Sequence, residues 1–240
     1  ADAFAQWYGE DHPRPDLTPA VYGLTEFHRG AVADADLVAN PGCYPTAVAL
    51  ALAPLAHAAA IDSTDIVVVA ASGTSGAGRK PSDSLLATSV MGSMSAYKVG
   101  GIHQHTPEME QSIAAAAGED PSAVRVSFTP LLAPMPRGIV ATCSAPVLPG
   151  HDPGAIIRAA YSDEQFVTVL DEGQWPTTGA VLGTNGAQVQ VSVDEHAGRV
   201  IVVSVIDNLG KGAAGQAIQN ANLMLGLDEA CGLDLIGIAP

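Results

Sequence analysis

The chain has 240 residues, of which 48% are hydrophobic and 15% are charged, so it can bury a core without disulfide or metal cross-links. Its 25 Asp and Glu residues outnumber 10 Lys and Arg residues, and the formal charge of −15 disfavours binding to nucleic acid or to an anionic membrane surface. That charge still permits a small anionic metabolite, because the few cationic and N–H groups that line a pocket set its local potential.

In chain order, residues 1–35 are polar and rich in turn residues, and we expect them to form a connecting region. A short strand over 36–39 and the turn Asn40-Pro41-Gly42 come next. An apolar helix is predicted from residue 43 to about residue 53, with Pro45 in its first turn. The β-branched run 64–71 predicts a strand buried on both faces, and the glycine-rich loop 72–80 follows it.

The second half of the chain is dominated by strand-like runs. After a helix expected from about residue 105 to residue 117, strands are predicted over 124–132, 139–147, 166–170, 188–193 and 200–206. The last two form a hairpin around His196-Ala197-Gly198, and a helix is expected over 213–225. This order predicts an α+β fold with one large, mainly antiparallel or mixed sheet and helices on one face.

The cysteines and the apolar stretches indicate where in the cell the protein is found. Cys43, Cys143 and Cys231 are an odd number without a Cys-x-x-Cys spacing, which is typical of a reducing cytosol and forms no zinc motif. The longest apolar stretch, 47–61, is shorter than the roughly 20 residues that cross a bilayer. The first 17 residues carry acids and prolines and do not have the pattern of a signal peptide. We expect a cytoplasmic protein with no metal and no membrane partner.

Cys43 is the best candidate for a nucleophile. Because it follows Pro-Gly and opens a helix, its sulfur should lie near unsatisfied N–H groups and the positive end of the helix dipole, both of which favour the thiolate. A cysteine without such a setting is more often a small buried hydrophobic residue, and we interpret Cys143 and Cys231 in that way.

His103 and His105 stand at the start of the next predicted helix, 60 residues after Cys43 in the case of His103. A His-x-His pair alone could hold zinc, cap the helix or lie on the surface. If the fold brings the pair beside Cys43, one imidazole can accept the thiol proton and exchange a proton with a substrate carbonyl oxygen.

Two further features could bind anions. The loop 72–80 has glycines at 73, 76 and 78, which let backbone N–H groups approach a ligand, and it ends in Arg79 and Lys80. It matches neither a dinucleotide fingerprint nor a P-loop, so alone it predicts only a flexible turn. Arg137 could hold a carboxylate or phosphate through two hydrogen bonds, although alone it is more typical of a surface ion pair.

The segments around these residues resemble the N-acetyl-γ-glutamyl-phosphate reductases of the arginine pathway. The longest match is residues 38–47 (VANPGCYPTA), followed by Ala51, Leu52 and Pro54. Thr25, where the family usually has Pro, and Gly210, at a variable position, depart from the pattern away from the proposed chemistry. Four further blocks are similar, appear in the family's order and span nearly the whole chain: 22–26 (YGLTE), 72–79 (SGTSGAGR), 103–108 (HQHTPE) and 207–216 (DNLGKGAAGQ).

The resemblance implies an NADPH-dependent oxidoreductase. Cys43 would attack the acyl phosphate of N-acetylglutamyl phosphate, phosphate would leave, and hydride transfer to the thioester would release the semialdehyde. His105 is implied as the acid/base ahead of His103, because the related aspartate-semialdehyde dehydrogenases place their catalytic His just before a similar helix. The resemblance also implies that the nicotinamide end of NADP is held by Ser72, Gly73, Gly76 and Asn208, and the substrate by Arg137 and Arg79.

Members of this family begin with a Rossmann domain that carries a glycine-rich fingerprint, and no such segment precedes Ala1. We expect residues 1–40 to be the tail of that NADP-binding region with a connector, and 41–207 to be the catalytic, substrate-binding and dimerisation domain. Residues 208–240 are expected to form a C-terminal helix and tail that pack back on the Rossmann domain. The expected partners are that domain and further copies of the chain, as a homodimer or homotetramer.

Three other functions remain compatible with the residues alone. The first is a related reductase for aminoadipyl or aspartyl phosphate, which would differ only in its pocket residues. The second is a Cys-His acyl transferase or hydrolase that uses no nicotinamide. The third is a scaffold that only forms oligomers through its large sheet. Phosphate-dependent oxidation of the semialdehyde with NADP separates the reductases from the acyl transferase or hydrolase and from the scaffold.

Overall fold

The computed structural model describes residues 2–14, 16, 20–235 and 237. The predicted segments 1–40 and 208–240 both include residues that lie outside the described ones, namely 1, 15, 17–19, 236 and 238–240.

A seven-stranded mixed sheet forms the body of the molecule, with strand order β4-β5-β3-β6-β9-β8-β7. The pairs β3–β5 and β7–β8 are parallel and the other pairs are antiparallel. The predicted α+β fold with a large mixed sheet is therefore confirmed. The strands are β3 (Ile66–Ser72), β4 (Ser95–Ala96), β5 (Val126–Leu132), β6 (Ile139–Pro146), β7 (Val167–Val169), β8 (Ala187–Asp194) and β9 (Arg199–Ile206).

The hairpin β8–β9 forms where the sequence predicts it. Val193 pairs with Val200 and Asp194 with Arg199. Gly198 adopts a φ of 66°, which glycine tolerates without steric cost, and the Asp194 carboxylate accepts a hydrogen bond from the N–H of Ala197.

The central helix α3 (Cys43–His57) begins at the predicted residue and buries every residue from Tyr44 to Ala56. It continues past the predicted end near residue 53 and contains Pro54. A proline at this position cannot donate to the carbonyl of Leu50. The hydroxyl of Tyr161 donates to that carbonyl instead, at 2.6 Å, so the helix keeps its acceptor satisfied. This long-range compensation explains why a prediction from neighbouring residues ends the helix too early.

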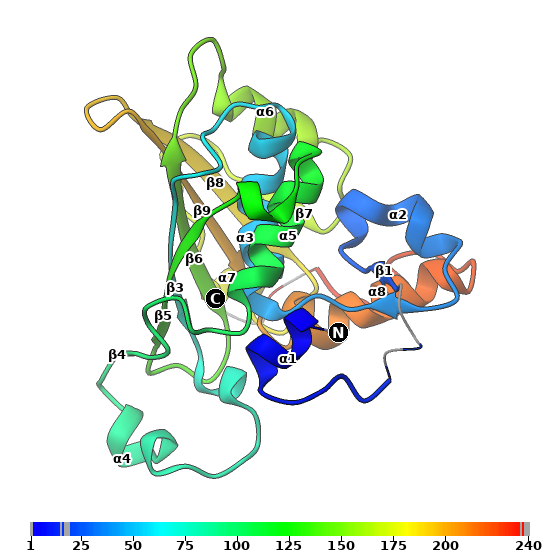
Figure 1. The fold of residues 1–240 in the computed structure, drawn as a ribbon, viewed down its shortest axis with the longest axis vertical. Helices are drawn as coiled ribbons and strands as arrows, with labels where there is room; N and C mark the ends of the chain where they lie inside the picture. Colours follow the sequence, from blue (N-terminus) through cyan, green and yellow to red (C-terminus); the bar gives the residue numbers. More distant parts are fainter. Residues whose placement is uncertain (1, 15, 17–19, 236, 238–240) are drawn as a thin grey trace.

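Helices cover one face of the sheet. In Figure 1, α3, α5 (Thr106–Ala117) and α6 (Pro153–Ala160) lie on the same side of the strands. Residues of β3 that point to the opposite side remain accessible, and Val67 and Val69 are 39% and 40% exposed. Among the described residues the second face of the sheet carries no helix, and we call it the open face.

Residues 1–35, which we expect to be a turn-rich connecting region, contain two short helices. These are α1 (Asp2–Tyr8) and α2 (Thr25–Ala33), and the strands β1 (Val21–Tyr22) and β2 (Val38–Ala39) pair in parallel beside them. Helix α2 forms because it packs on α8 (Gly215–Met224) through a buried hydrogen bond from Thr25 Oγ1 to Asn220 Oδ1. The short elements are η2 (Thr74–Ala77), η3 (Asp83–Leu85), α4 (Ala87–Val90), η4 (Pro121–Ala123), α7 (Thr178–Val181) and the π-helical η5 (Gly210–Ala214).

A buried ion pair joins α2 to the segment that follows β9. Lys211 in η5 and Glu26 in α2 are both fully buried and form a hydrogen-bonded pair. Lys211 also donates to Gln219 at 2.7 Å and lies 5.6 Å from the centre of the Phe166 ring. The pair connects residues near both ends of the chain at the base of α3.

We predict that Lys211→Met lowers the free energy of unfolding by about 3–5 kcal/mol, because it leaves the Glu26 carboxylate buried without its counter-charge. The double variant Glu26→Gln/Lys211→Met should lose much less, because it removes both charges together. Urea denaturation of the two variants and the parent protein measures the difference. Equal losses in the single and double variants would show that the charge pairing is not the cause.

Candidate active site

Cys43 is the first residue of α3, and its position depends on the turn before it. The N–H of Gly42 donates to the Glu108 carboxylate at 2.8 Å, which ties the turn to the first turn of α5. A Cβ added at Gly42 would lie only 2.8 Å from Nε2 of His105 and 3.1 Å from Oε2 of Glu108. A larger residue at position 42 would therefore require the side chains of His105 and Glu108 to move away from the cysteine turn.

The other side of Cys43 is closed by η5. A Cβ added at Gly212 would lie 2.9 Å from the Cβ of Cys43, so the backbone of η5 packs directly against the cysteine. The N–H of Gly212 donates to the carbonyl of Asp207 at 2.9 Å, which holds this approach. Two glycines that are far apart in the sequence thus fix the cysteine between α5 and η5.

The two histidines lie together with aromatic rings. His103 is buried, and its Nδ1 accepts a hydrogen bond from the backbone N–H of His105 at 3.1 Å. The rings of Tyr44, Tyr97 and Phe128 meet His103 edge-on, with centroids 5.6, 5.8 and 5.2 Å away. Burial lowers the pKa of both His103 and His105 to about 4, so both imidazoles are neutral at physiological pH.

His105 has an unused ring nitrogen. Its Nδ1 is buried and has no hydrogen-bond partner among the described residues. Glu108, three residues later in the first turn of α5, accepts hydrogen bonds from Gly42 N–H and from the Tyr22 hydroxyl at 3.0 Å. Burial raises the pKa of Glu108, and these two donors oppose that rise. Glu108 therefore fixes the geometry between His105 and the cysteine turn.

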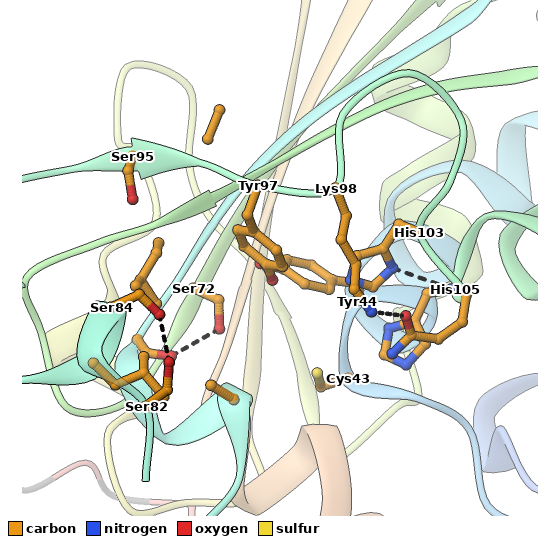
Figure 2. A pocket seen from close by; sticks show the side chains of 17 residues that line it. Cys43, Tyr44, Ser72, Ser82, Ser84, Ser95, Tyr97, Lys98, His103 and His105 are labelled. Atoms are coloured by element: carbon orange, nitrogen blue, oxygen red, sulfur yellow. Dashed lines mark hydrogen bonds between the residues drawn. The ribbon is translucent and has the colours of Figure 1, made fainter. Parts of the chain in front are cut away.

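A cavity of about 560 Å³ opens above Cys43. Figure 2 shows Cys43 between the serines of the 72–84 segment on one side and the two histidines on the other. The lining residues come from α3, β3, the 73–98 segment, the 103–105 turn before α5, and β5: Cys43, Tyr44, Ser72, Gly73, Gly76, Ala77, Ser82, Ser84, Leu85, Ser95, Ala96, Tyr97, Lys98, His103, Gln104, His105 and Leu132.

The fold thus brings Cys43, His103, His105, Ser72, Gly73 and Gly76 to one cavity, but it places three other predicted residues outside the lining. Asn208 accepts from Gly138 N–H at 2.7 Å and donates to Ser75 Oγ at 3.0 Å, so its amide supports the glycine-rich loop from behind. Arg137 pairs with the buried Asp207 at 3.1 Å. Arg79 is exposed and, like Asn208 and Arg137, is not among the residues that line the cavity.

Sequence reasoning missed Lys98. It is the one cationic side chain among the described residues that line the cavity. Its Nζ donates to Oε1 of Gln104 at 2.6 Å, and its φ of 44° lies in the left-handed region that non-glycine residues seldom adopt. Strain of this kind is common at functional sites. The two consecutive glycines that follow Lys98 and Val99 could have marked this turn in the sequence.

Burial opposes the effect of the helix start on the Cys43 thiol. Burial raises the pKa of its thiol to about 11, and the N–H groups of Tyr44 and Cys43 only partly offset this. The negative charge of Glu108 adds to the rise. Desolvation outweighs the helix start, so the free site holds a neutral thiol beside neutral imidazoles.

Comparison with known proteins shows which class of protein has this arrangement. Residues 43–208 match the family model described as semialdehyde dehydrogenase, dimerisation domain. The solved aspartate semialdehyde dehydrogenase II from Vibrio cholerae has the same fold, with a TM-score of 0.69 and 18% identity over 86% of this chain and 68% of that one. A Candida albicans aspartate semialdehyde dehydrogenase solved with NADP has a TM-score of 0.59 at 16% identity, over 86% of this chain and 66% of that one.

Curated relatives narrow the class. N-acetyl-gamma-glutamyl-phosphate reductase from Acidothermus cellulolyticus is 54% identical over 99% of this chain and 69% of its own length. The reductase of the same name from Streptomyces coelicolor is 56% identical over 91% of this chain and 64% of its own length. The chain belongs to the N-acetyl-gamma-glutamyl-phosphate reductase family, and it spans about two thirds of the length of these relatives.

The described residues offer neither a metal site nor a membrane span. No group of three or more His, Cys, Asp or Glu side chains in the described part of the chain could hold a metal ion. None of the helices described is both long enough and apolar enough to cross a membrane.

The raised pKa of Cys43 gives a measurable pH dependence. We predict that iodoacetamide modifies Cys43 slowly at pH 7 and that the rate rises about tenfold per pH unit up to about pH 9.5, because the thiolate fraction grows tenfold per unit below the pKa. Peptide mass spectrometry follows each cysteine separately, and the exposed Cys231 serves as the internal control. A Cys43 rate that levels off near pH 7 would contradict the buried neutral thiol.

Proposed function

We propose that this chain carries the catalytic part of an NADPH-dependent reductase that converts N-acetyl-L-glutamyl 5-phosphate to N-acetyl-L-glutamate 5-semialdehyde and phosphate, in arginine biosynthesis. The observation that carries the proposal is Cys43, held at a helix start in a cavity that two neutral histidines border. The curated relatives, which are 54% and 56% identical, bear the corresponding name.

In the proposed first half-reaction, His105 accepts the Cys43 proton and the sulfur attacks the acyl carbon. The carbon–oxygen bond to phosphate breaks, phosphate leaves with the electron pair, and a thioester remains on Cys43. A buried imidazole that is neutral at physiological pH is available to accept this proton. Glu108 lies near enough to the same turn to stabilise the imidazolium that results.

The second half-reaction needs a hydride, which NADPH supplies to the thioester carbonyl carbon when it is bound. His105 then returns its proton to the thiolate of Cys43 as the carbon–sulfur bond breaks. His103 positions His105, because its Nδ1 accepts the hydrogen bond from the His105 backbone. The products are the aldehyde and the free Cys43 thiol.

The glycine-rich loop fits the nicotinamide end of such a cofactor. A Cβ at Gly73 would lie 2.7 Å from the backbone nitrogen of Arg137, and a Cβ at Gly76 would lie 2.9 Å from Ser72 Oγ. The loop can therefore bring its backbone to the cavity edge only with glycine at both positions. We propose that Ser72, Gly73 and Gly76 face the nicotinamide and that Asn208 holds the loop in place through Ser75.

Lys98 is the proposed contact for an anionic group of the substrate, because it is the cation that lines the cavity among the described residues. We propose that Arg137 supports the same function indirectly, by joining the loop backbone at Gly73 to the buried Asp207. Arg79 is proposed to meet the substrate at the exposed end of the loop.

The proposed domain organisation follows the relatives. We propose that residues 1–40 and 208–240 connect the catalytic part, 41–207, to an NADP-binding Rossmann domain of the same protein. The relatives' additional length leaves room for such a domain. We further propose a homodimer or homotetramer, supported by the dimerisation domain that the family model describes. We also propose a cytoplasmic location, which is supported by the three free cysteines.

We predict that Cys43→Ser abolishes turnover and that His105→Asn lowers kcat by roughly 10²–10⁴-fold with a small change in KM, since the proton transfer is used mainly in the transition state. NADP reduction with the semialdehyde and phosphate measures both in the full-length enzyme. His151→Asn, on an exposed loop before α6, is the matched control. If His103→Asn alone lowers kcat in this way, His103 is the acid/base. Release of N-acetylglutamate without nicotinamide would instead favour the acyl transferase or hydrolase.

We predict that residues 1–240 alone fold but bind NADPH much more weakly than the full-length protein, because the groups for pyrophosphate and adenosine come from the proposed Rossmann domain. Calorimetric titration with NADPH compares the two proteins under the same conditions. Similar affinities would mean that the cofactor site is misplaced.

A further inference from the structure

Tyr22 belongs to the connecting segment 1–40, yet its side chain reaches the cysteine turn. Its hydroxyl donates to Oε1 of Glu108 at 3.0 Å, although the two residues are 86 positions apart in the sequence. The same carboxylate oxygen accepts the N–H of Gly42, the residue before Cys43, at 2.8 Å. One oxygen atom of Glu108 therefore joins the connecting segment to the turn that carries the cysteine.

The backbone of Tyr22 is held in place by the strand pair β1–β2. Tyr22 pairs with Ala39, which lies just before the cysteine turn. The N–H of Gly23 donates to the carbonyl of Ala39 at 2.9 Å. The amide of Asn220 in α8 donates to the carbonyl of Gly23 at 2.8 Å. Because β2 leads directly into the turn, the phenol of Tyr22 keeps a fixed position relative to it.

Glu108 has no cationic partner that would keep it ionised. No Lys, Arg or His side chain in the described part of the chain forms an ion pair with it. The thiol of Cys43 on α3, the imidazole of His105 before α5 and the phenol of Tyr22 on β1 are all uncharged at neutral pH. His28 on α2 lies edge-on to the Tyr22 ring, and burial lowers its pKa. Burial raises the pKa of Glu108, and the two hydrogen bonds are what oppose this rise.

The charge of Glu108 acts on the groups beside it. In addition to burial, this carboxylate raises the pKa of the Cys43 thiol. A Cβ added at Gly42 would lie 3.1 Å from Oε2 of Glu108 and 2.8 Å from Nε2 of His105, so the carboxylate and the imidazole border the same turn. An anion at this place favours the protonated form of both the thiol and the imidazole. The protonation of one carboxyl group therefore influences how readily Cys43 loses its proton.

We propose that Tyr22 is a positioning residue of the active site, which holds the ionised carboxylate of Glu108 against the cysteine turn and thereby keeps a negative charge beside Cys43. Tyr22 acts through Glu108 and not on the substrate. The connecting segment is then part of the chemistry, because the negative charge stabilises an imidazolium at His105. This last step rests on the proposed function, whereas the contacts and the charge exist without substrate.

The test compares three variants of the full-length protein. Tyr22→Phe removes the hydroxyl and keeps the ring, and Glu108→Gln removes the charge. Tyr161→Phe is the matched control, because it removes another buried phenol hydroxyl, which donates to the carbonyl of Leu50 in α3. Methyl methanethiosulfonate reacts with the thiolate, and peptide mass spectrometry gives the rate at Cys43 from about pH 5 to about pH 10.

The expected result is a difference confined to one pH window. Loss of the Tyr22 hydroxyl raises the pKa of Glu108, so within that window the carboxyl group is charged in the parent and protonated in Tyr22→Phe. There Cys43 should react roughly three- to tenfold faster in the variant, because its thiol no longer faces a negative charge. Above the window the two rates converge. Glu108→Gln should remain faster than the parent above the window as well, and Tyr161→Phe should follow the parent throughout.

Infrared difference spectroscopy reports the protonation of Glu108 directly. The carbonyl band of a protonated carboxyl group that is missing in Glu108→Gln belongs to this residue. That band should persist to a higher pH in Tyr22→Phe than in the parent or in Tyr161→Phe.

A Tyr22→Phe profile that coincides with the parent's at every pH would overturn the proposal. A rate raised by the same factor at every pH would also overturn it, because that result indicates a loosened turn and not a changed charge. The same holds for a Tyr161→Phe profile with the same window. An unchanged Cys43 rate in Glu108→Gln would overturn it even if Tyr22→Phe folds poorly. None of these measurements uses substrate or cofactor, so an inactive parent enzyme would contradict the proposed function alone.

Discussion

The close approach of backbone at Gly42 and Gly212 is the constraint on which the site depends. Either glycine, given a Cβ, would put that carbon within 3 Å of a neighbour, His105 in one case and Cys43 in the other. Since packed interiors absorb such overlaps poorly, a larger residue at Gly42 would displace the side chains of His105 and Glu108, and one at Gly212 would push η5 away from Cys43. Either change alters the placement of the groups around Cys43. The placement of Cys43 relative to His105 therefore depends on Gly42 and Gly212.

The rest of the fold holds α3 and η5 in position through two different kinds of interaction. Helix α3 is fixed by apolar burial, since every residue from Tyr44 to Ala56 is buried and the sheet lies beneath it. Segment η5 is fixed by polar groups, because Lys211 is buried among Glu26, Gln219 and the Phe166 ring. A buried ion pair adds a directional constraint to such packing, because its charges are satisfied only with good geometry and further hydrogen bonds. This difference suits a segment that must place Gly212 accurately against Cys43.

Local patterns predicted most of the elements, and long-range contacts account for what they missed. The helix start at Cys43, the strand β3 and the β8–β9 hairpin follow from turn residues and periodicity. The extension of α3 through Pro54 needs the Tyr161 hydroxyl, and α2 needs α8, neither of which neighbouring residues reveal. The proximity of Cys43 to the histidines was inferred from family resemblance. Lys98 was not predicted, because the cavity that it lines is formed by segments that are distant in the sequence.

The protonation state of the site was the least accessible property from sequence. A helix start favours the thiolate, and burial favours the thiol, and only the structure shows that burial dominates the pKa of Cys43. The same burial keeps the imidazoles neutral, so the resting cavity holds no ion pair between cysteine and histidine. Proton transfer between them creates two charges in a poorly hydrated space, which is costly unless an electrophile consumes the thiolate as it forms. A thiol that ionises only with substrate in place is also protected from oxidants, because the thiolate is the form that they attack.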